Sequence, residues 1–397
     1  QRPVPERLLQ VWWVRHLSHL ALGALALIAV AMPFIVPLPS RHLLYASIVA
    51  FAICAISLTI VTGWAGQLSL SQMAFAGIGA LSAAAFNRGL TVGVGIGDKW
   101  EFFSVSLPKT PYLVSMLLAV IVGAASAAVI GLGALRVKGL LLAVTTFAFA
   151  MAAQQYFYRL PILSDNGKRA VTYRRGSLGP FDLTTQRSYY LLCLAVLAIV
   201  LALVARLRRS GIGRSIIAVR ENEDTASAYT VSPTRTKLLA FSLAGGIAGL
   251  GGALLGGLVQ SISYGDRFFL IGDSLRMVSI IVIGGLGSLM GPVLGALWVV
   301  GLPAFWPGND LVPLFTSSIG LLILLLYFPG GLIQIAYSAR DALLAWVENR
   351  LPETPVKTLT TPPASVIGGR ADRTTPDGAA IAVRDVSVSF GGLRAVD

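Results

Sequence analysis

The sequence predicts an all-α membrane protein that crosses the bilayer several times. Hydrophobic residues make up 55% of its 397 residues and charged residues only 12%, whereas about 25% of the residues in a soluble domain are charged. Several uncharged runs approach the roughly 20 apolar residues that a helix needs to cross a bilayer. Glycine accounts for 42 residues, which suits close helix packing in lipid. We expect about 8–10 transmembrane helices, some of them broken or re-entrant.

The charge balance agrees with a membrane location. The formal net charge is +13, which we interpret as basic loops that face the cytoplasm and anionic lipid headgroups. No soluble basic domain is visible, so nucleic-acid binding is not expected. The histidines His16, His19 and His42 all lie near the N-terminal edge. We therefore expect no metal site and no catalytic centre within the membrane.

The N-terminal region should lead into the first spans. Residues 1–19 combine Trp12 and Trp13 with basic residues, a composition typical of a helix that lies in the headgroup region. A basic flank of the first span fits this composition equally well. The first span is expected over residues 20–38, and the transmembrane domain as a whole over residues 20–337.

Residues 63–80, GWAGQLSLSQMAFAGIGA, are too polar for a lipid-facing helix and too apolar for a loop. Irregular backbone at membrane depth is tolerated where it is buried in protein or lines a water-filled cavity, and short glycine-interrupted segments point to a translocation path. A tightly packed helix with satisfied Ser and Gln side chains is the alternative. The polar groups expected along the path, two of them from a span over residues 139–158, are Gln67, Ser69, Ser71, Gln72, Thr145 and Thr146.

Residues 211–239 form a strongly polar run between two apolar segments. An ordinary cytoplasmic loop and a docking element for a cytoplasmic partner both fit, and we favour the docking element. This run and the basic turn at Arg136 and Lys138 fall on the same side of the membrane, which the positive-inside rule makes cytoplasmic. Both chain termini are expected on that side. The basic loop over residues 161–188 disagrees, since it would be external.

The span expected over residues 240–259 repeats small residues four positions apart. Gly245 precedes Gly249, and Gly252 precedes Gly256. This spacing favours close contact with another helix. A helix of this chain and a helix of a second subunit both remain possible partners.

The C-terminal third combines broken spans with a soluble extension. Residues 277–305 are interrupted by glycine and proline, which predicts two half-segments. The last span, over residues 311–328, ends at the sequence PGG. Residues 338–380 should hold an amphipathic helix, over 338–351, and a flexible linker. Residues 381–390 alternate apolar and polar side chains like a strand.

These segments resemble a known family. The motifs GWAGQLSLSQMAFAGIGA, GRSIIAVRENEDTASAYTVSPTRTKLLAFSLAGGIAGLGGALLG, SIIVIGGLGSLMGPVLGAL and YFPGGL follow one another as in the permease subunits of branched-chain amino acid ABC importers. The resemblance implies a second permease subunit, cytoplasmic ATPase subunits that hydrolyse ATP, and an extracytoplasmic solute-binding protein. It also implies import across the cytoplasmic membrane by alternating access. Similar permeases carry urea or short amides, which form an alternative substrate class.

The resemblance extends to the polar run. In such permeases the loop between these two spans carries coupling helices that dock in a groove of the ATPase, which places them here within residues 211–235. Tyr229 departs from the pattern, because the family commonly has a small residue at that position. The residues that match are Gly213, Arg214, Ala218, Arg220, Glu221 and Asn222, followed by Arg235, Lys237 and Leu238.

Residues 381–397, IAVRDVSVSFGGLRAVD, are similar to the N-terminus of the ATPase subunits of the same transporters. The resemblance implies that the permease is fused to the start of an ATPase domain, in which Phe390 would stack on adenine. The phosphate-binding motif GxxxxGK followed by Ser or Thr does not occur in the sequence. Hydrolysis of ATP by this sequence alone is therefore not expected.

An ion-coupled secondary transporter or a channel is the competing functional class. Such proteins usually place ionisable groups or carbonyl cages at mid-depth in the membrane. The expected spans hold no carboxylate or lysine at that depth. An ATP-driven permease is therefore the favoured class.

Overall fold

The computed structural model describes residues 12–95, 101–106, 108–137, 139–165, 170–178, 181–263, 269–305, 311–316, 320–348, 388–390 and 393–396. Lys138 and the expected linker over residues 352–378 lie outside the described residues. The chain divides into two compact units, Gln1–Leu344 and Ala345–Asp397. Each unit is described by itself.

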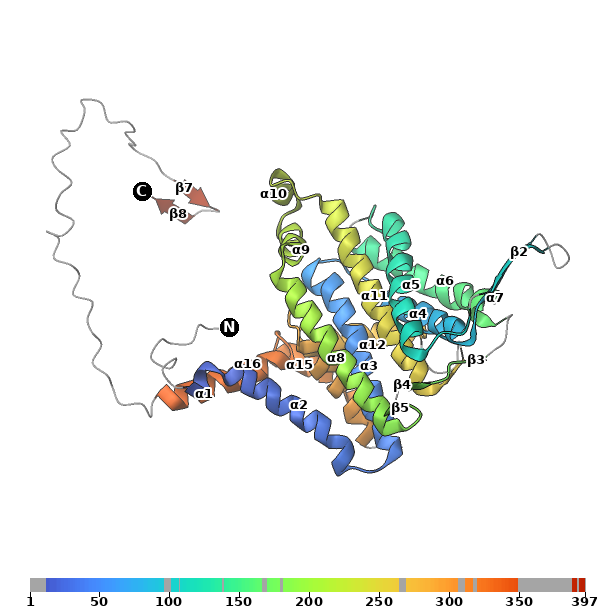
Figure 1. Ribbon diagram of the computed structural model, residues 1–397. Helices are drawn as coiled ribbons and strands as arrows, with labels where there is room; N and C mark the ends of the chain where they lie inside the picture. Colours follow the sequence, from blue (N-terminus) through green and yellow to red (C-terminus); the bar gives the residue numbers. More distant parts are fainter. Residues whose placement is uncertain are drawn as a thin grey trace, which may run out of the picture. The chain divides into compact units, whose positions relative to one another are not determined.

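The first unit is built almost entirely of helices (Figure 1). Helix α3 continues without interruption into the π-helical turn η2, Thr59–Trp64. The helices in chain order are α1 (Trp12–Arg15), α2 (Leu17–Ile35), α3 (Pro39–Leu58), α4 (Gln72–Arg88), α5 (Tyr112–Ala134), α6 (Leu140–Gln155), α7 (Pro161–Ser164), α8 (Gln186–Arg209), α9 (Gly211–Glu221), α10 (Glu223–Ala228), α11 (Pro233–Val259), α12 (Ile271–Gly284), α13 (Gly291–Ala296), α14 (Leu311–Leu314), α15 (Gly320–Tyr327) and α16 (Leu332–Glu348).

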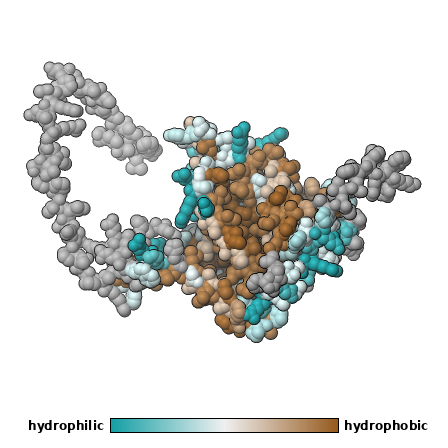
Figure 2. All heavy atoms as spheres, in the orientation of Figure 1, coloured by the Kyte–Doolittle hydropathy of each residue, from teal (hydrophilic) through white to brown (hydrophobic). Residues whose placement is uncertain are grey.

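Within the described residues, five helices are long and apolar enough to cross a membrane. They are Pro39–Trp64, Tyr112–Ala134, Leu140–Arg159, Gln186–Arg209 and Pro233–Val259, and the shorter apolar helices Leu20–Ile35 and Gly291–Phe305 accompany them. Figure 2 shows hydrophobic residues across the middle of these helices, with hydrophilic residues near α9 and α10 at one end and near β3 at the other. The predicted all-α polytopic membrane fold is confirmed.

Helix α11 lies at the centre of the first unit and packs along α3, α4 and α5 (Figure 1). Its small residues make this packing close. A Cβ at Gly249 would lie 2.6 Å from the carbonyl oxygen of Ala119 in α5, and a Cβ at Gly245 would lie 2.6 Å from that of Gly123. Gly252 abuts the backbone of Ala76 in α4 in the same way. The small-residue repeat therefore serves contacts within this chain.

The expected breaks in the last spans are present. Helix α12 ends at Gly284 and α13 begins at Gly291, which confirms two half-segments. Of the last expected span, over residues 311–328, the structure describes α14 and α15, and residues 317–319 lie outside the described residues. Helix α16 covers part of the expected amphipathic helix and begins at Leu332, before the predicted start at 338.

The first unit also contains short two-stranded sheets. Strand β3 (Ala170–Thr172) pairs antiparallel with β6 (Ser261–Ser263), β1 (Thr91–Gly95) with β2 (Glu101–Ser106), and β4 (Ser177–Leu178) with β5 (Phe181–Asp182). The β3–β6 pair ties the predicted external loop to the end of α11. In this loop Arg175 donates hydrogen bonds to the carbonyl oxygens of Gly257 and Leu258.

The second unit holds a small hairpin. Strand β7 covers Val388–Phe390, within the strand expected over residues 381–390, of which residues 381–387 lie outside the described residues. It pairs antiparallel with β8, Leu393–Val396, so that Phe390 lies opposite Leu393.

The close packing of α11 can be tested with Gly252→Ala. The added Cβ would overlap the carbonyl oxygen of Ala76, and overpacking of this kind typically costs about 1–3 kcal/mol. We expect a lower melting temperature for the detergent-solubilised protein. Gly133→Ala is the matched control, because no described atom lies within 4 Å of a Cβ placed at that helical position. Equal melting temperatures for the two variants would contradict this packing.

Candidate translocation and coupling site

The segment between α3 and α4 is a broken membrane helix. After Trp64 the chain leaves the helical conformation, with Gly66 at φ +67°, and α4 starts at Gln72. The predicted path residues of this segment are buried. The Oγ atoms of Ser69 and Ser71 lie 3.0 Å apart, and Oε1 of Gln72 accepts a hydrogen bond of 3.2 Å from Ser57. The polar side chains of this segment are thus enclosed by protein, and their role in a translocation path stays a prediction.

The two threonines predicted for the path behave differently. The hydroxyl of Thr146 accepts a hydrogen bond of 3.0 Å from the backbone N–H of Leu70, so α6 holds the broken segment directly. Thr145 is exposed and donates to the carbonyl oxygen of Leu142 in its own helix. The structure therefore brings Thr146 to the buried segment and places Thr145 elsewhere.

The broken segments of the chain meet at one place, which we call the glycine junction: Gly63, Gly285, Leu286, Gly330 and Gly331. Gly63 abuts the carbonyl oxygen of Leu286, in the turn between α12 and α13. Gly285, at φ +114°, lies against the backbone of Gly330 and Gly331, in the turn between α15 and α16. No residue with a Cβ would fit at Gly63 without a shift of this backbone.

Helices α9 and α10 form the predicted pair in the polar run. The hydroxyl of Ser210 caps α9 by accepting from the N–H of Gly213 at 3.4 Å, and Oδ1 of Asn222 caps α10 by accepting from the N–H of Thr225 at 3.0 Å. Side-chain oxygens at these positions satisfy N–H groups that the helix itself leaves without partners. The sequence therefore folds locally into two short helices with a fixed break at Asn222.

Helix α9 has an inner and an outer face. Gly213, Ile216 and Val219 are buried, three residues apart, and Gly213 lies against the last turn of α8. Arg214, Ala218, Glu221 and Asn222 are exposed. Beyond α10, the side chain of Tyr229 is 77% exposed, and Thr230 takes the left-handed conformation that makes the turn, at φ +64°.

Arg220 connects this helix pair to the broken segment. Its Nη1 atom donates a hydrogen bond of 2.5 Å to the carbonyl oxygen of Gly63, although the residues are 157 positions apart. Its Cγ atom would lie 3.0 Å from a Cβ at Gly66. The resemblance predicts a role for Arg220 in docking to the ATPase and says nothing of this contact. In the structure the Arg220 side chain is exposed to solvent, like Arg214 and Glu221, and its guanidinium also contacts Gly63 of the glycine junction.

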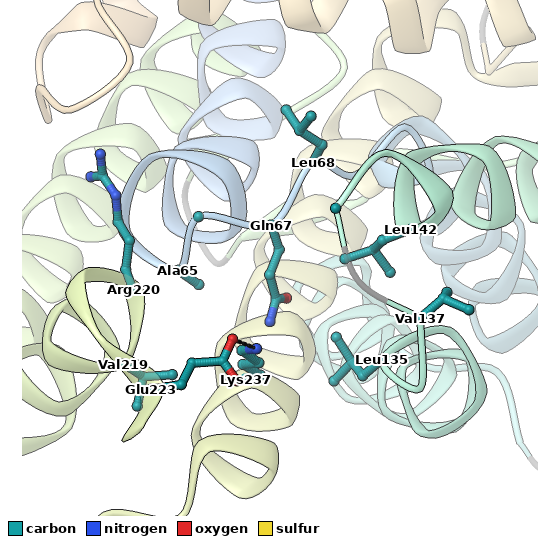
Figure 3. A pocket seen from close by; sticks show the side chains of 12 residues that line it. Ala65, Gln67, Leu68, Leu135, Val137, Leu142, Val219, Arg220, Glu223 and Lys237 are labelled. Carbon is teal, nitrogen blue, oxygen red and sulfur yellow. Dashed lines mark hydrogen bonds and ion pairs between the residues drawn. The ribbon is translucent and has the colours of Figure 1, made fainter. Parts of the chain in front are cut away.

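A pocket of about 160 Å³ lies beside this connection (Figure 3). Gln67 lies on one side of it, and Lys237 at the start of α11 forms an ion pair with Glu223 of α10 on another. The residues that match the family motif include Lys237 but not Glu223. Only the fold shows that these two side chains meet. The other lining residues are Ala65, Gly66, Leu68, Leu135, Val137, Gly139, Leu142, Val219 and Arg220.

The residues that line the pocket show which loops lie at the same end of the helices. The turn between α5 and α6, which contains Leu135 and Val137, lines it together with Val219 of α9. The basic turn and the polar run are therefore at the same end of the helices, as the sequence predicts.

These features define a multi-pass membrane protein in which a polar helix pair at one end is tied to a buried, broken helix. Comparison with known proteins agrees with this class. Residues 41–326 match the family described as the permease component of the branched-chain amino acid transport system, and the chain belongs to this family. The predicted family is thereby confirmed.

Curated relatives point the same way. The chain is 28% identical over 342 residues to the high-affinity branched-chain amino acid transport system permease protein LivM of Salmonella typhimurium, covering 80% of this chain and 75% of that protein. It is 27% identical to LivM of Escherichia coli K12 over the same shares of both chains. No solved structure matches the chain significantly.

The cap at Asn222 can be tested with Asn222→Ala. Loss of the side-chain acceptor typically costs about 1 kcal/mol of helix stability, so backbone amides of α10 should exchange with deuterium about fivefold faster. Asn222→Asp keeps an acceptor oxygen and should exchange like the parent protein. Equal protection in the alanine variant would show that the cap does not stabilise α10.

Proposed function

We propose that this chain is a translocation subunit of an ATP-driven importer for branched-chain amino acids. Membership of the permease family supports the class, and the similarity to the branched-chain amino acid permease LivM supports the substrate. Urea and short amides remain the alternative substrates. The single observation that carries the mechanism is the hydrogen bond between Arg220 and the Gly63 carbonyl.

The outer face of α9 is the proposed contact for the ATPase. Arg214, Ala218, Glu221 and Asn222 are exposed there, and Tyr229 extends an aromatic side chain from the end of α10. Exposed aromatic and arginine side chains are enriched at the centres of protein interfaces. ATP, bound by partner ATPase domains, would drive closure of those domains and displace this helix pair.

Arg220 is the proposed link between that movement and the path. Because its guanidinium binds the backbone of Gly63, a displacement of α9 would pull on the end of the broken segment. That segment carries Gln67, Ser69 and Ser71, and its hydrogen bond to Thr146 couples it to α6. Alternating access would follow from movement of this polar backbone between two positions.

The remaining partners complete the importer. α9 and α10 would face the cytoplasm, with both termini, and a solute-binding protein would dock at the opposite end, near β3 and β6. A second permease subunit would supply the rest of the pore. The assignment of residues 381–397 to an ATPase domain, with Phe390 stacking on adenine, remains part of this proposal.

The proposed link can be tested with Arg220→Met in the assembled transporter, reconstituted in liposomes with its binding protein. Loss of the Gly63 hydrogen bond should uncouple the sites, and coupling energies of this kind correspond to changes of about 5- to 150-fold. We expect leucine uptake per ATP hydrolysed to decrease by about 5- to 150-fold while ATPase activity persists.

Arg209→Met is the matched control, because it removes a neighbouring exposed positive charge from the last turn of α8. It should transport like the parent protein. Normal uptake by the double variant Arg220→Met and Glu221→Gln would show that α9 has no coupling role. ATP-independent uptake driven by an ion gradient would instead favour the secondary-transporter class.

A further inference from the structure

The pocket under α9 and α10 contains a buried amide without a partner. The side chain of Gln67 is 5% exposed, and neither its nitrogen nor its oxygen forms a hydrogen bond within the described part of the chain. Buried polar atoms almost always have partners, because leaving them unpaired is unfavourable. In Figure 3 the amide points into the pocket, toward Lys237 and Glu223. The Nε2 group of Gln67 can therefore donate to a ligand in the pocket, and its Oε1 atom can accept from one.

Opposite charges lie at the same place. Lys237 and Glu223 form an ion pair at the pocket wall, with side chains 17% and 36% exposed. An ammonium group has three donors and a carboxylate about four acceptor positions. Both groups therefore have more hydrogen-bonding positions than a single ion pair uses. The pair offers a cationic and an anionic contact side by side.

The rest of the wall is largely apolar. Leu135, Val137 and Leu142 come from the turn between α5 and α6, and Val219 comes from α9. The pocket has about 160 Å³, which is roughly ten times the space that a single water molecule requires. The space suits a solute of amino-acid size, and the apolar side chains suit an aliphatic substituent on it.

We propose that this pocket is a low-affinity binding site for an aliphatic α-amino acid. The ligand carboxylate binds Lys237, its ammonium group binds Glu223, the Gln67 amide completes the polar contacts, and the side chain lies against Leu135, Val137 and Leu142. The inference rests on the proposed function, under which the site lies at the cytoplasmic end of the path. A solute that has passed the broken segment would occupy it before release.

The test uses the complete transporter in detergent, without the solute-binding protein and without ATP. L-Leucine is titrated at millimolar concentrations by calorimetry, alongside 4-methylpentanoate, which lacks the ammonium group, and 3-methylbutylamine, which lacks the carboxylate. We expect saturable binding of leucine and at least tenfold weaker binding of both analogues. Equal binding of either analogue, or binding of urea or acetamide in place of leucine, would overturn the proposal.

Gln67→Leu is the decisive variant. It replaces the amide with an apolar side chain of similar size, and no hydrogen bond within the described residues is lost, so the melting temperature without ligand should not fall. Leucine should bind about tenfold more weakly or not at all. Glu223→Gln should weaken binding as well, whereas Thr225→Ala, a change at an exposed position two residues further along α10, should not. Unchanged leucine binding in Gln67→Leu would contradict the site.

A separate uptake measurement distinguishes this inference from the function on which it rests. If binding-protein-dependent leucine uptake is normal and the transporter alone binds no leucine, the pocket is not an amino-acid site and the proposed function stands. If leucine is neither transported nor bound, the proposed function fails and the site fails with it.

Discussion

The close approach of backbone to backbone at the glycine junction is the constraint on which the rest of the structure depends. Gly63 lies against the carbonyl of Leu286, and Gly285 lies against Gly330. Broken helices leave backbone polar groups that lipid cannot satisfy. Packing the breaks against one another encloses them within protein. The polar path segment, the α12–α13 turn and the turn before α16 are therefore parts of one arrangement.

The junction also explains how a surface element can act on a buried one. Arg220 extends from α9 and binds the carbonyl of Gly63, at the edge of the junction. A guanidinium donates in a fixed, planar geometry, so it transmits position better than a flexible ammonium group. The outer face of α9 stays free of this contact. Helix α9 therefore has an exposed surface for a partner and, through Arg220, a hydrogen bond to the broken segment.

The sequence predicts the helices well because apolar length and polarity are local properties. It also predicts the breaks, since glycine and proline mark them directly. The contacts between distant segments were not predictable. The sequence groups Thr145 with Thr146 because they are adjacent. Adjacent helical residues point about 100° apart, so only Thr146 contacts the broken segment. The pairing of Lys237 with Glu223 depends on how α10 folds back on α11, and spacing alone does not fix it.

The central claim is that α9 moves the broken segment through Arg220. A spin label at Leu68 would report the position of the broken segment, and one at Ser227 the position of the α9–α10 pair. The distance from each label to a second label at Val129 on α5 is measured. The described native cysteines, Cys54 and Cys193, are buried. On addition of ATP to the assembled transporter, we expect both distances to change in the parent protein. In Arg220→Met, the distance from Ser227 should still change and that from Leu68 should not. Equal changes of the Leu68 distance in both proteins would contradict the account.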